Sequence, residues 1–320
     1  MSRKLISVVS VLEEKHKAQI RAAAEMNGFE ALFFDGPGQA RPFLAEAEIV
    51  FGHDAELAHI TPRLRWLCTP FAGVDQLIGQ TVFTSAQAVL TNSSGAYGVT
   101  ISEHVVLMIL EVLRRQAEYG ALLRRKEWKR DLPVRSIRGS RITLLGTGDI
   151  GKESAKRLRA FDPASLTGVN RSGKNPGSLF GRVFAQDEME TALSGTDILV
   201  AALPGTPQTH RLLNARRLSL LPDQALVVNV GRGSAVDQKA LEKELRKGRL
   251  FAALDVFEQE PIPRDDPIWD CPNLLMTPHV AGNMMLPYTK DRIVSLFLED
   301  FENYCAGRPL KRRVDPARGY

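Results

Sequence analysis

The sequence predicts an α/β protein built from two parallel α/β domains, and three observations support this. Short apolar segments of strand length alternate with stretches of helical periodicity, and this alternation occurs twice along the chain. One long apolar segment with helical spacing, beginning near residue 100, separates the two series. The chain has 320 residues, 44% hydrophobic and 25% charged, which is enough for about two domains with separate cores.

The first series predicts a small parallel α/β domain over residues 1–99. Its expected strands are 5–11, 31–34, 48–52 and 65–68, with a helix over 13–26. The spacing Thr100-x-x-Glu103 is typical of a capping box, so we expect the long helix to begin there and to lead into a second domain, 100–286. The C-terminal segment, 287–320, is expected to return to the first domain, and it begins with a last helix over 287–304.

The second series predicts a doubly wound sheet of six strands with helices between them. The expected strands are 142–145, 166–169, 197–203, 225–230, 250–256 and 274–277, and the expected helices are 150–160, 187–194, 214–220 and 237–247.

A glycine pattern, Gly146-x-Gly148-x-x-Gly151, follows the first of these strands and opens a helix. The first glycine permits a tight turn, the second lets a ligand approach the main chain, and the third lets helix and strand pack closely. The helix N-terminus then faces the negative charge of a pyrophosphate. The pattern predicts a dinucleotide site; taken alone, three glycines are equally typical of a simple turn.

The residues after the next strand indicate which dinucleotide binds. Asn170, Arg171 and Ser172, with Lys174 close by, stand about 20 residues past the glycines, where NAD-binding domains carry a carboxylate for the ribose. A guanidinium, a hydroxyl and an ammonium suit a 2′-phosphate instead, so we expect NADP to be preferred. Asn170 retains the capacity to hydrogen-bond a ribose hydroxyl, so NAD stays possible, and a solvated basic turn is the alternative interpretation.

Three polar residues, Arg232, Glu260 and His279, follow three consecutive strands of the second domain. Singly, each has a structural explanation as a surface arginine, an exposed loop acid and a packed histidine. Because the carboxyl ends of parallel strands face the ligand crevice, we expect the three to converge. A guanidinium can hold a substrate carboxylate, an imidazolium can protonate a carbonyl oxygen, and a carboxylate can orient the ring and favour its charged form. This set predicts reduction of a 2-keto acid.

Composition excludes several other classes. The net charge of +5 is modest, and the densest basic stretch, 124–141, contains acidic residues and no base-reading motif, so nucleic acid is not an expected partner. Three dispersed cysteines, Cys68, Cys271 and Cys305, have no metal-ligand spacing, so we expect no metal and a reduced, cytoplasmic location. No apolar stretch approaches the ~18 residues of a membrane span.

Over nearly its whole length the chain resembles the D-2-hydroxyacid dehydrogenases, a family that includes glyoxylate/hydroxypyruvate reductases and phosphoglycerate dehydrogenase. The resemblance implies a Rossmann domain inserted in a smaller, flavodoxin-like substrate-binding domain. It also implies that Arg232, Glu260 and His279 are catalytic and that the backbone of Gly73 and Val74 binds the substrate carboxylate. The motifs that carry it are FAGVD (71–75), GTGDIG (146–151), LPGTPQT (203–209), NVGRG (229–233), LDVFEQEP (254–261) and TPHVAG (277–282).

The resemblance also implies the cofactor contacts and an assembly. The family is usually a homodimer joined through its nucleotide domains, with the segment after the crossing helix as an arm, so part of 124–138 would be interface. The implied cofactor residues are Gly146, Gly148, Asp149, Ile150 and Gly151 at the pyrophosphate, Asn170, Arg171 and Ser172 at the ribose, Leu203, Pro204 and Thr209 at the adenosine, and Val230, Gly231, Asp255 and Gly282 toward the nicotinamide.

Two departures from the family pattern leave alternatives open. Many members have an aspartate after the second strand and use NAD, whereas this chain has Asn170-Arg171-Ser172, which resembles the NADP-preferring pattern. Many also have a tryptophan after the last glycine of the histidine motif, where this chain has Asn283-Met284-Met285 after Gly282. The chain also lacks the regulatory extension of longer phosphoglycerate dehydrogenases, so feedback by serine is not expected. We expect an NADPH-preferring reductase of glyoxylate or hydroxypyruvate. The alternatives are an NAD-linked, phosphoglycerate-type 2-hydroxy acid dehydrogenase and a dinucleotide-sensing, corepressor-like binding protein.

Overall fold

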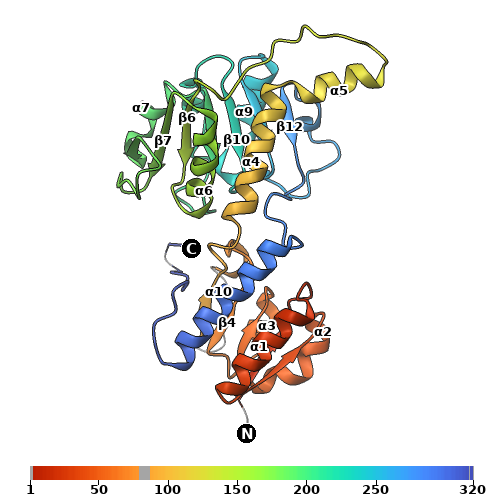
Figure 1. Cartoon of the computed structure of the whole chain (residues 1–320), viewed down its shortest axis with the longest axis vertical. Helices are drawn as coiled ribbons and strands as arrows, with labels where there is room; N and C mark the ends of the chain where they lie inside the picture. The colour runs from red at the N-terminus through yellow and green to blue at the C-terminus, as the bar shows by residue number, and fades with distance from the viewer. Residues whose placement is uncertain (1–2, 79–86, 317, 320) are drawn as a thin grey trace. The chain divides into compact units, whose positions relative to one another are not determined.

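The computed structural model describes residues 3–78, 87–316 and 318–319 and divides the chain into two compact units. The outer unit contains Met1–Tyr97 and Asn283–Tyr320, and the inserted unit contains Gly98–Gly282. Within the described residues, each unit has one parallel sheet, of five strands in the outer unit and seven in the inserted unit (Figure 1). The predicted α/β class with two parallel sheets is confirmed.

The inserted unit is a doubly wound sheet with the strand order β12-β11-β10-β9-β6-β7-β8. β6 has β9 on one side and β7 on the other, so the chain reverses direction across the sheet beside the loop that follows β6, where such folds bind ligands. β9, β10 and β11 are buried at every residue, as expected when helices cover both faces. The strands are β6 Arg141–Leu145, β7 Ser165–Asn170, β8 Arg182–Ala185, β9 Ile198–Ala201, β10 Leu226–Asn229, β11 Phe251–Leu254 and β12 Leu274–Met276.

The helices of this unit cover its apolar sheet. α4 runs alongside α6 and lies across β10 and β11 (Figure 1). Leucine, valine and alanine side chains from the strands form one core with those of α7, α8 and α9. The helices are α4 Gly98–Leu113, α5 Gln116–Arg124, α6 Asp149–Leu158, α7 Met189–Leu193, α8 Ala215–Ser219 and α9 Gln238–Arg246.

The outer unit has the strand order β2-β1-β3-β4-β5. Helix α10 packs on this sheet through Phe297, whose ring stacks on Phe51 and Trp66 with centroid distances of 4.4 and 5.3 Å. The strands are β1 Arg3–Ser7, β2 Phe29–Phe33, β3 Ala47–Phe51, β4 Trp66–Cys68 and β5 Val89–Thr91, and the helices are α1 Glu14–Met26, α2 Pro37–Ala40, α3 Ala55–His59 and α10 Pro287–Cys305. Short 3-10 helices span Arg41–Glu46, Asp75–Leu77, Arg159–Phe161, Gln186–Glu188, Gly233–Ala235 and Pro267–Asp270.

Three predictions about these elements were wrong. The outer sheet has five strands instead of four, because β5 has only three residues and pairs with β4 at the sheet edge. The inserted sheet has seven strands instead of six: β8 is a short edge strand with one fully buried residue, Phe184, and its apolar run ends with the strand at Ala185, so it is shorter than the runs of about 4–8 residues that indicate a strand. Helix α4 begins at Gly98, ahead of the predicted cap, and Thr100 lies buried in its first turn. The cap comes from a distant residue: the Asp149 carboxylate accepts a hydrogen bond from the Gly98 N–H at 2.9 Å.

Among the described residues, no helix is both long and apolar enough to cross a membrane.

Candidate functional site

The glycine loop after β6 has the shape that a dinucleotide needs. A Cβ on Gly146, whose φ is +95°, would lie 2.5 Å from the Ala202 carbonyl oxygen, and one on Gly151 would lie 2.0 Å from the Gly146 carbonyl oxygen. A Cβ on Gly148 would meet no atom of the described residues within 4 Å. The outer glycines therefore close the loop, and the middle one leaves space beside the N-terminus of α6. Main-chain N–H groups and the positive end of the helix dipole suit a pyrophosphate there.

Asp149 and Ile150 occupy the first two positions of α6. The Asp149 side chain faces the N-terminus of α4, and a Cβ on Gly98 would lie 2.5 Å from its carboxylate oxygen. This contact requires glycine at position 98 and ties the glycine loop to the first residue of α4.

The turn after β7 presents the predicted phosphate-binding side chains. Arg171, Ser172 and Lys174 are exposed, whereas the Asn170 side chain is half-buried and hydrogen-bonded to Thr147 at 2.9 Å. Basic groups therefore lie at the end of β7, next to the glycine loop.

The loop after β9 contains the residues that were predicted for the adenosine side. Leu203 and Pro204 are half-buried, and the Thr209 hydroxyl donates to the Pro204 carbonyl oxygen at 2.6 Å. The same hydroxyl accepts from the Thr206 N–H at 3.0 Å. Thr209 is buried and shapes this loop from within.

Backbone contacts at two glycines bring three neighbouring loops together. A Cβ on Gly231 would lie 2.5 Å from the Leu203 nitrogen, and one on Gly233 would lie 1.9 Å from the Phe257 carbonyl carbon. The loop after β10 is thus packed between the loops that follow β9 and β11. Arg232, between the two glycines, is held on the side of the sheet where β11 ends.

Asn229 shapes that loop, a role which the sequence reasoning missed. Its buried side chain donates to the Arg232 carbonyl oxygen at 3.0 Å and accepts from the Gly231 N–H at 3.2 Å. An asparagine at a strand end before Gly-x-Gly is the available sequence signal, because its side chain mimics a turn. Val230 next to it is buried, and the Arg232 guanidinium donates to the Gly231 carbonyl oxygen at 2.9 Å.

Glu260 and His279 are in direct contact. The Glu260 Oε2 atom lies 2.6 Å from His279 Nδ1, and its Oε1 atom accepts from the Phe257 N–H at 2.8 Å. The His279 side chain is 51% exposed, and its Nε2 is the ring nitrogen that Glu260 does not engage. Because β10, β11 and β12 are adjacent parallel strands, the arginine, the glutamate and the histidine follow three neighbouring strands at one edge of the sheet.

The buried Asp255 carboxylate holds the histidine loop. It accepts from the Thr277 hydroxyl at 2.5 Å, from the Val280 N–H at 2.9 Å and from the Ala281 N–H at 3.0 Å. The Asp255 carbonyl oxygen accepts from the His279 N–H at 2.8 Å, and His279 has a left-handed φ of +53°. These bonds fix the direction in which the imidazole leaves the backbone. Gly282, half-buried, is the last residue of the inserted unit.

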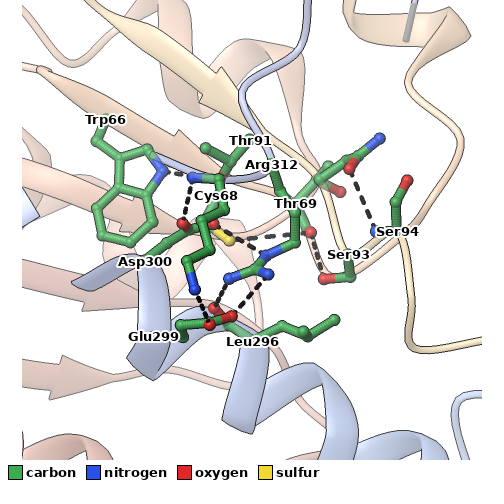
Figure 2. A network of polar contacts seen from close by, with 12 residues as sticks. Trp66, Cys68, Thr69, Thr91, Ser93, Ser94, Leu296, Glu299, Asp300 and Arg312 are labelled. Carbon is green, nitrogen blue, oxygen red and sulfur yellow. Dashed lines mark hydrogen bonds and ion pairs between the residues drawn. The ribbon is translucent and has the colours of Figure 1, made fainter. Parts of the chain in front are cut away.

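In the outer unit, hydrogen bonds from three side chains to backbone carbonyl oxygens hold the loop that contains Gly73 and Val74. The Ser93 hydroxyl donates to the Thr69 carbonyl oxygen at 2.9 Å (Figure 2). Val74 is buried, and Gly73 is half-buried. Two further side chains also donate to carbonyl oxygens of this loop: Asn92 to Ala72 at 2.9 Å and Tyr97 to Pro70 at 2.7 Å.

The C-terminal segment packs on the same sheet, against helix α10 and strand β5. Arg312 lies 3.0 Å from Asp300 and 2.8 Å from Glu299, and it donates to the Leu296 carbonyl oxygen at 2.8 Å (Figure 2). Val314 N–H donates to the carbonyl oxygen of β5 residue 90, so this segment pairs along the sheet edge. Burial raises the pKa of the nearby Cys68 thiol to about 12, so this cysteine stays protonated and serves as a core residue.

Comparison with known proteins identifies the family to which the chain is similar. Residues 106–281, more than half of the chain, match the NAD binding domain of D-isomer specific 2-hydroxyacid dehydrogenases. Glyoxylate/hydroxypyruvate reductase A of Salmonella newport is 35% identical over 227 residues, which are 70% of each chain.

Two solved structures extend the similarity to the whole chain. A D-isomer specific 2-hydroxyacid dehydrogenase family protein from Aeromonas salmonicida is 30% identical, with a TM-score of 0.87 and coverage of 99% of this chain and 100% of the other. The NADPH-dependent glyoxylate/hydroxypyruvate reductase from Sinorhizobium meliloti, in complex with NADP and sulfate, is 26% identical, with a TM-score of 0.84 and the same coverage. The protein with this glycine loop and this strand-end glutamate–histidine pair belongs to the D-isomer specific 2-hydroxyacid dehydrogenase family, as an oxidoreductase with an NAD(P)-binding domain.

Proposed function

We propose that this protein is an NADPH-preferring reductase of a small 2-keto acid, glyoxylate or hydroxypyruvate, that forms the D-isomer where the product is chiral. The observation that carries the proposal is the 2.6 Å contact between Glu260 and His279, on loops adjacent to that of Arg232. The Salmonella and Sinorhizobium relatives, which are named as glyoxylate/hydroxypyruvate reductases, support the choice of substrate.

The inserted unit would hold the cofactor. The open space beside Gly148 fits the pyrophosphate, and the exposed side chains of Arg171, Ser172 and Lys174 fit the 2′-phosphate. When bound, the nicotinamide supplies the hydride to the carbonyl carbon. The outer unit would bind substrate through the backbone of Gly73 and Val74.

The chain's own residues would supply the binding and the proton. Arg232 would form a bidentate ion pair with the substrate carboxylate through its guanidinium. Glu260 accepts the Nδ1–H of His279, and in the imidazolium form the other ring nitrogen, Nε2, carries the proton that goes to the carbonyl oxygen. The His279 side chain is 51% exposed, so Nε2 can recover its proton from water. Asp255 keeps the loop in place while this happens.

A panel of 2-keto acids, monitored at the nicotinamide absorbance with NADPH and with NADH, tests the proposal. We expect His279→Gln to lower kcat about 100- to 10,000-fold, the range for general acid catalysis, and to leave NADPH affinity unchanged. His210→Gln, an exposed histidine of the same unit, is the matched control. Near-normal turnover of His279→Gln would exclude the acid role, and equal efficiency with both cofactors would exclude the NADP preference.

We also propose a homodimer. Large apolar side chains on α4, α5 and the segment after them are exposed: Leu107 at 50%, Leu123 at 57%, Trp128 at 83% and Val134 at 46%. Exposed large apolar side chains along this stretch of the chain fit a subunit interface. Light scattering should give twice the chain mass of 35.4 kDa, and the mass of a single chain would refute the dimer.

A further inference from the structure

The side-chain amide of Asn170 is fully occupied within the protein. Its Nδ2 donates to the Thr147 hydroxyl at 2.9 Å and to the Lys174 carbonyl oxygen at 2.8 Å. Its Oδ1 accepts from the Gly173 N–H at 2.8 Å and from the Ser172 N–H at 3.1 Å. An asparagine amide has two N–H donors and two acceptor lone pairs. All four are used, so this conformation leaves no hydrogen-bonding capacity for a ribose hydroxyl.

These bonds define the turn that presents the basic side chains. The Asn170 side-chain oxygen accepts from the N–H groups two and three residues ahead, which is the pattern of an Asx-type turn. The bond from its NH₂ group to the residue 174 carbonyl oxygen closes the turn. Gly173 has a φ of +68°, and a Cβ there would lie 3.1 Å from the Ala185 nitrogen, so the turn also packs against the end of β8. The turn enclosed by these contacts contains Arg171 and Ser172.

The bond to Thr147 connects this turn to the glycine loop. Thr147 lies between Gly146 and Gly148 and is buried. One amide therefore sets the position of the 171–174 turn relative to the loop proposed for the pyrophosphate. A binding site whose parts are fixed in advance loses less entropy when its ligand arrives.

We infer that Asn170 is a positioning residue for the 2′-phosphate: it holds the 171–174 turn in place beside the glycine loop and makes no contact with the cofactor. This inference rests on the proposed NADP preference. An aspartate at this position would keep the acceptors for residues 172 and 173 but lose both donors, and its charge would face the Lys174 carbonyl oxygen. The hydrogen-bonding role therefore requires an amide.

Binding of 2′,5′-ADP and of ADP, measured by calorimetry on the full chain, tests this inference without turnover. We expect Asn170→Ala to weaken 2′,5′-ADP binding about 10-fold or more, because the turn loses its bonds, and to change ADP binding less than about twofold. Thr147→Val removes one of the bonds and keeps the methyl group, so we expect a smaller loss in the same direction. In turnover assays of Asn170→Ala, the KM for NADPH should rise, while kcat at saturating NADPH should stay within about twofold of the wild-type value.

Asn175→Ala is the matched control. Its amide bonds to the Phe180 carbonyl oxygen and the Gly177 N–H, outside the turn, so both nucleotides should bind as in the wild type. If Asn170 acts through Arg171, Asn170→Ala should have little further effect on 2′,5′-ADP binding in an Arg171→Ala background.

Two results would overturn the inference. Equal weakening of ADP and 2′,5′-ADP by Asn170→Ala would mean that the amide contacts the shared ribose or supports the whole site. Unchanged binding of both would mean that the turn does not need the amide. A wild-type protein that binds the two nucleotides equally would instead refute the NADP preference itself, so the two failures are distinguishable.

Discussion

Replacement of Glu260 by glutamine tests the glutamate–histidine pair most directly. The carboxylate accepts from two donors, the Phe257 N–H and, when the ring is protonated, His279 Nδ1–H. A glutamine offers one oxygen and one NH₂ group, so one donor must face another donor. The variant therefore either loses the bond that fixes its own position or loses the bond that holds the protonated ring.

The structure sets the size of the effect. A hydrogen bond to a charged group contributes about 1.5–3 kcal/mol. The two side chains are 51% and 33% exposed, so water replaces part of the lost bond, and we take about 1.5–2 kcal/mol. In the transition state this corresponds to about a 10- to 30-fold fall in kcat/KM for the keto acid.

The assay is steady-state reduction of the keto acid with NADPH, together with NADPH affinity by fluorescence. Glu258→Gln is the control, because that carboxylate, two residues before Glu260 in the chain, pairs with Arg211 and has no part in the proposed reaction. We expect the Glu260 variant to lose efficiency and keep its NADPH affinity, and the Glu258 variant to retain both. If Glu260→Gln stays within twofold of the wild type, the proposed orientation of the imidazole has no kinetic importance and our reasoning fails.

Three further predictions concern cofactor binding and stability. Gly151→Ala should abolish dinucleotide binding in calorimetry, since its Cβ would lie 2.0 Å from the carbonyl oxygen of the loop's first glycine; near-normal affinity would show that the loop can move aside. Arg312→Met should destabilise the outer unit by about 3–5 kcal/mol, because the buried Asp300 side chain, 1% exposed, loses its arginine partner. An unchanged thermal midpoint would contradict this. The side-chain hydrogen bond from the arginine that begins β6 lowers the pKa of Asp197, so this carboxylate stabilises the fold above its unfolded pKa of about 4, and the contribution is lost as pH falls through the lower folded value. Asp197→Asn should flatten the acid side of the stability curve in urea titrations, and a curve parallel to the wild type would refute the assignment.

Prediction from sequence succeeded for elements with strong local patterns. The buried strands β9, β10 and β11 are continuous apolar runs, and the glycine loop has a distinctive spacing. It failed for β5, for β8 and for the start of α4. The edge strand β8 depends on its pairing with β7, and the α4 cap comes from Asp149, 51 residues away in the chain. Neither dependence leaves a periodic signal near the element itself.

The sequence by itself determined the α/β class, the family resemblance and the positions of arginine, glutamate and histidine after successive strands. These follow from residue type and spacing, which are local properties. Only the tertiary structure decided which atoms meet. Glu260 Oε2 lies 2.6 Å from His279 Nδ1, and the Asn170 amide forms all its hydrogen bonds with its own turn and with Thr147. The reason is that a hydrogen bond depends on the distance and direction between two groups, and only the folded backbone sets both.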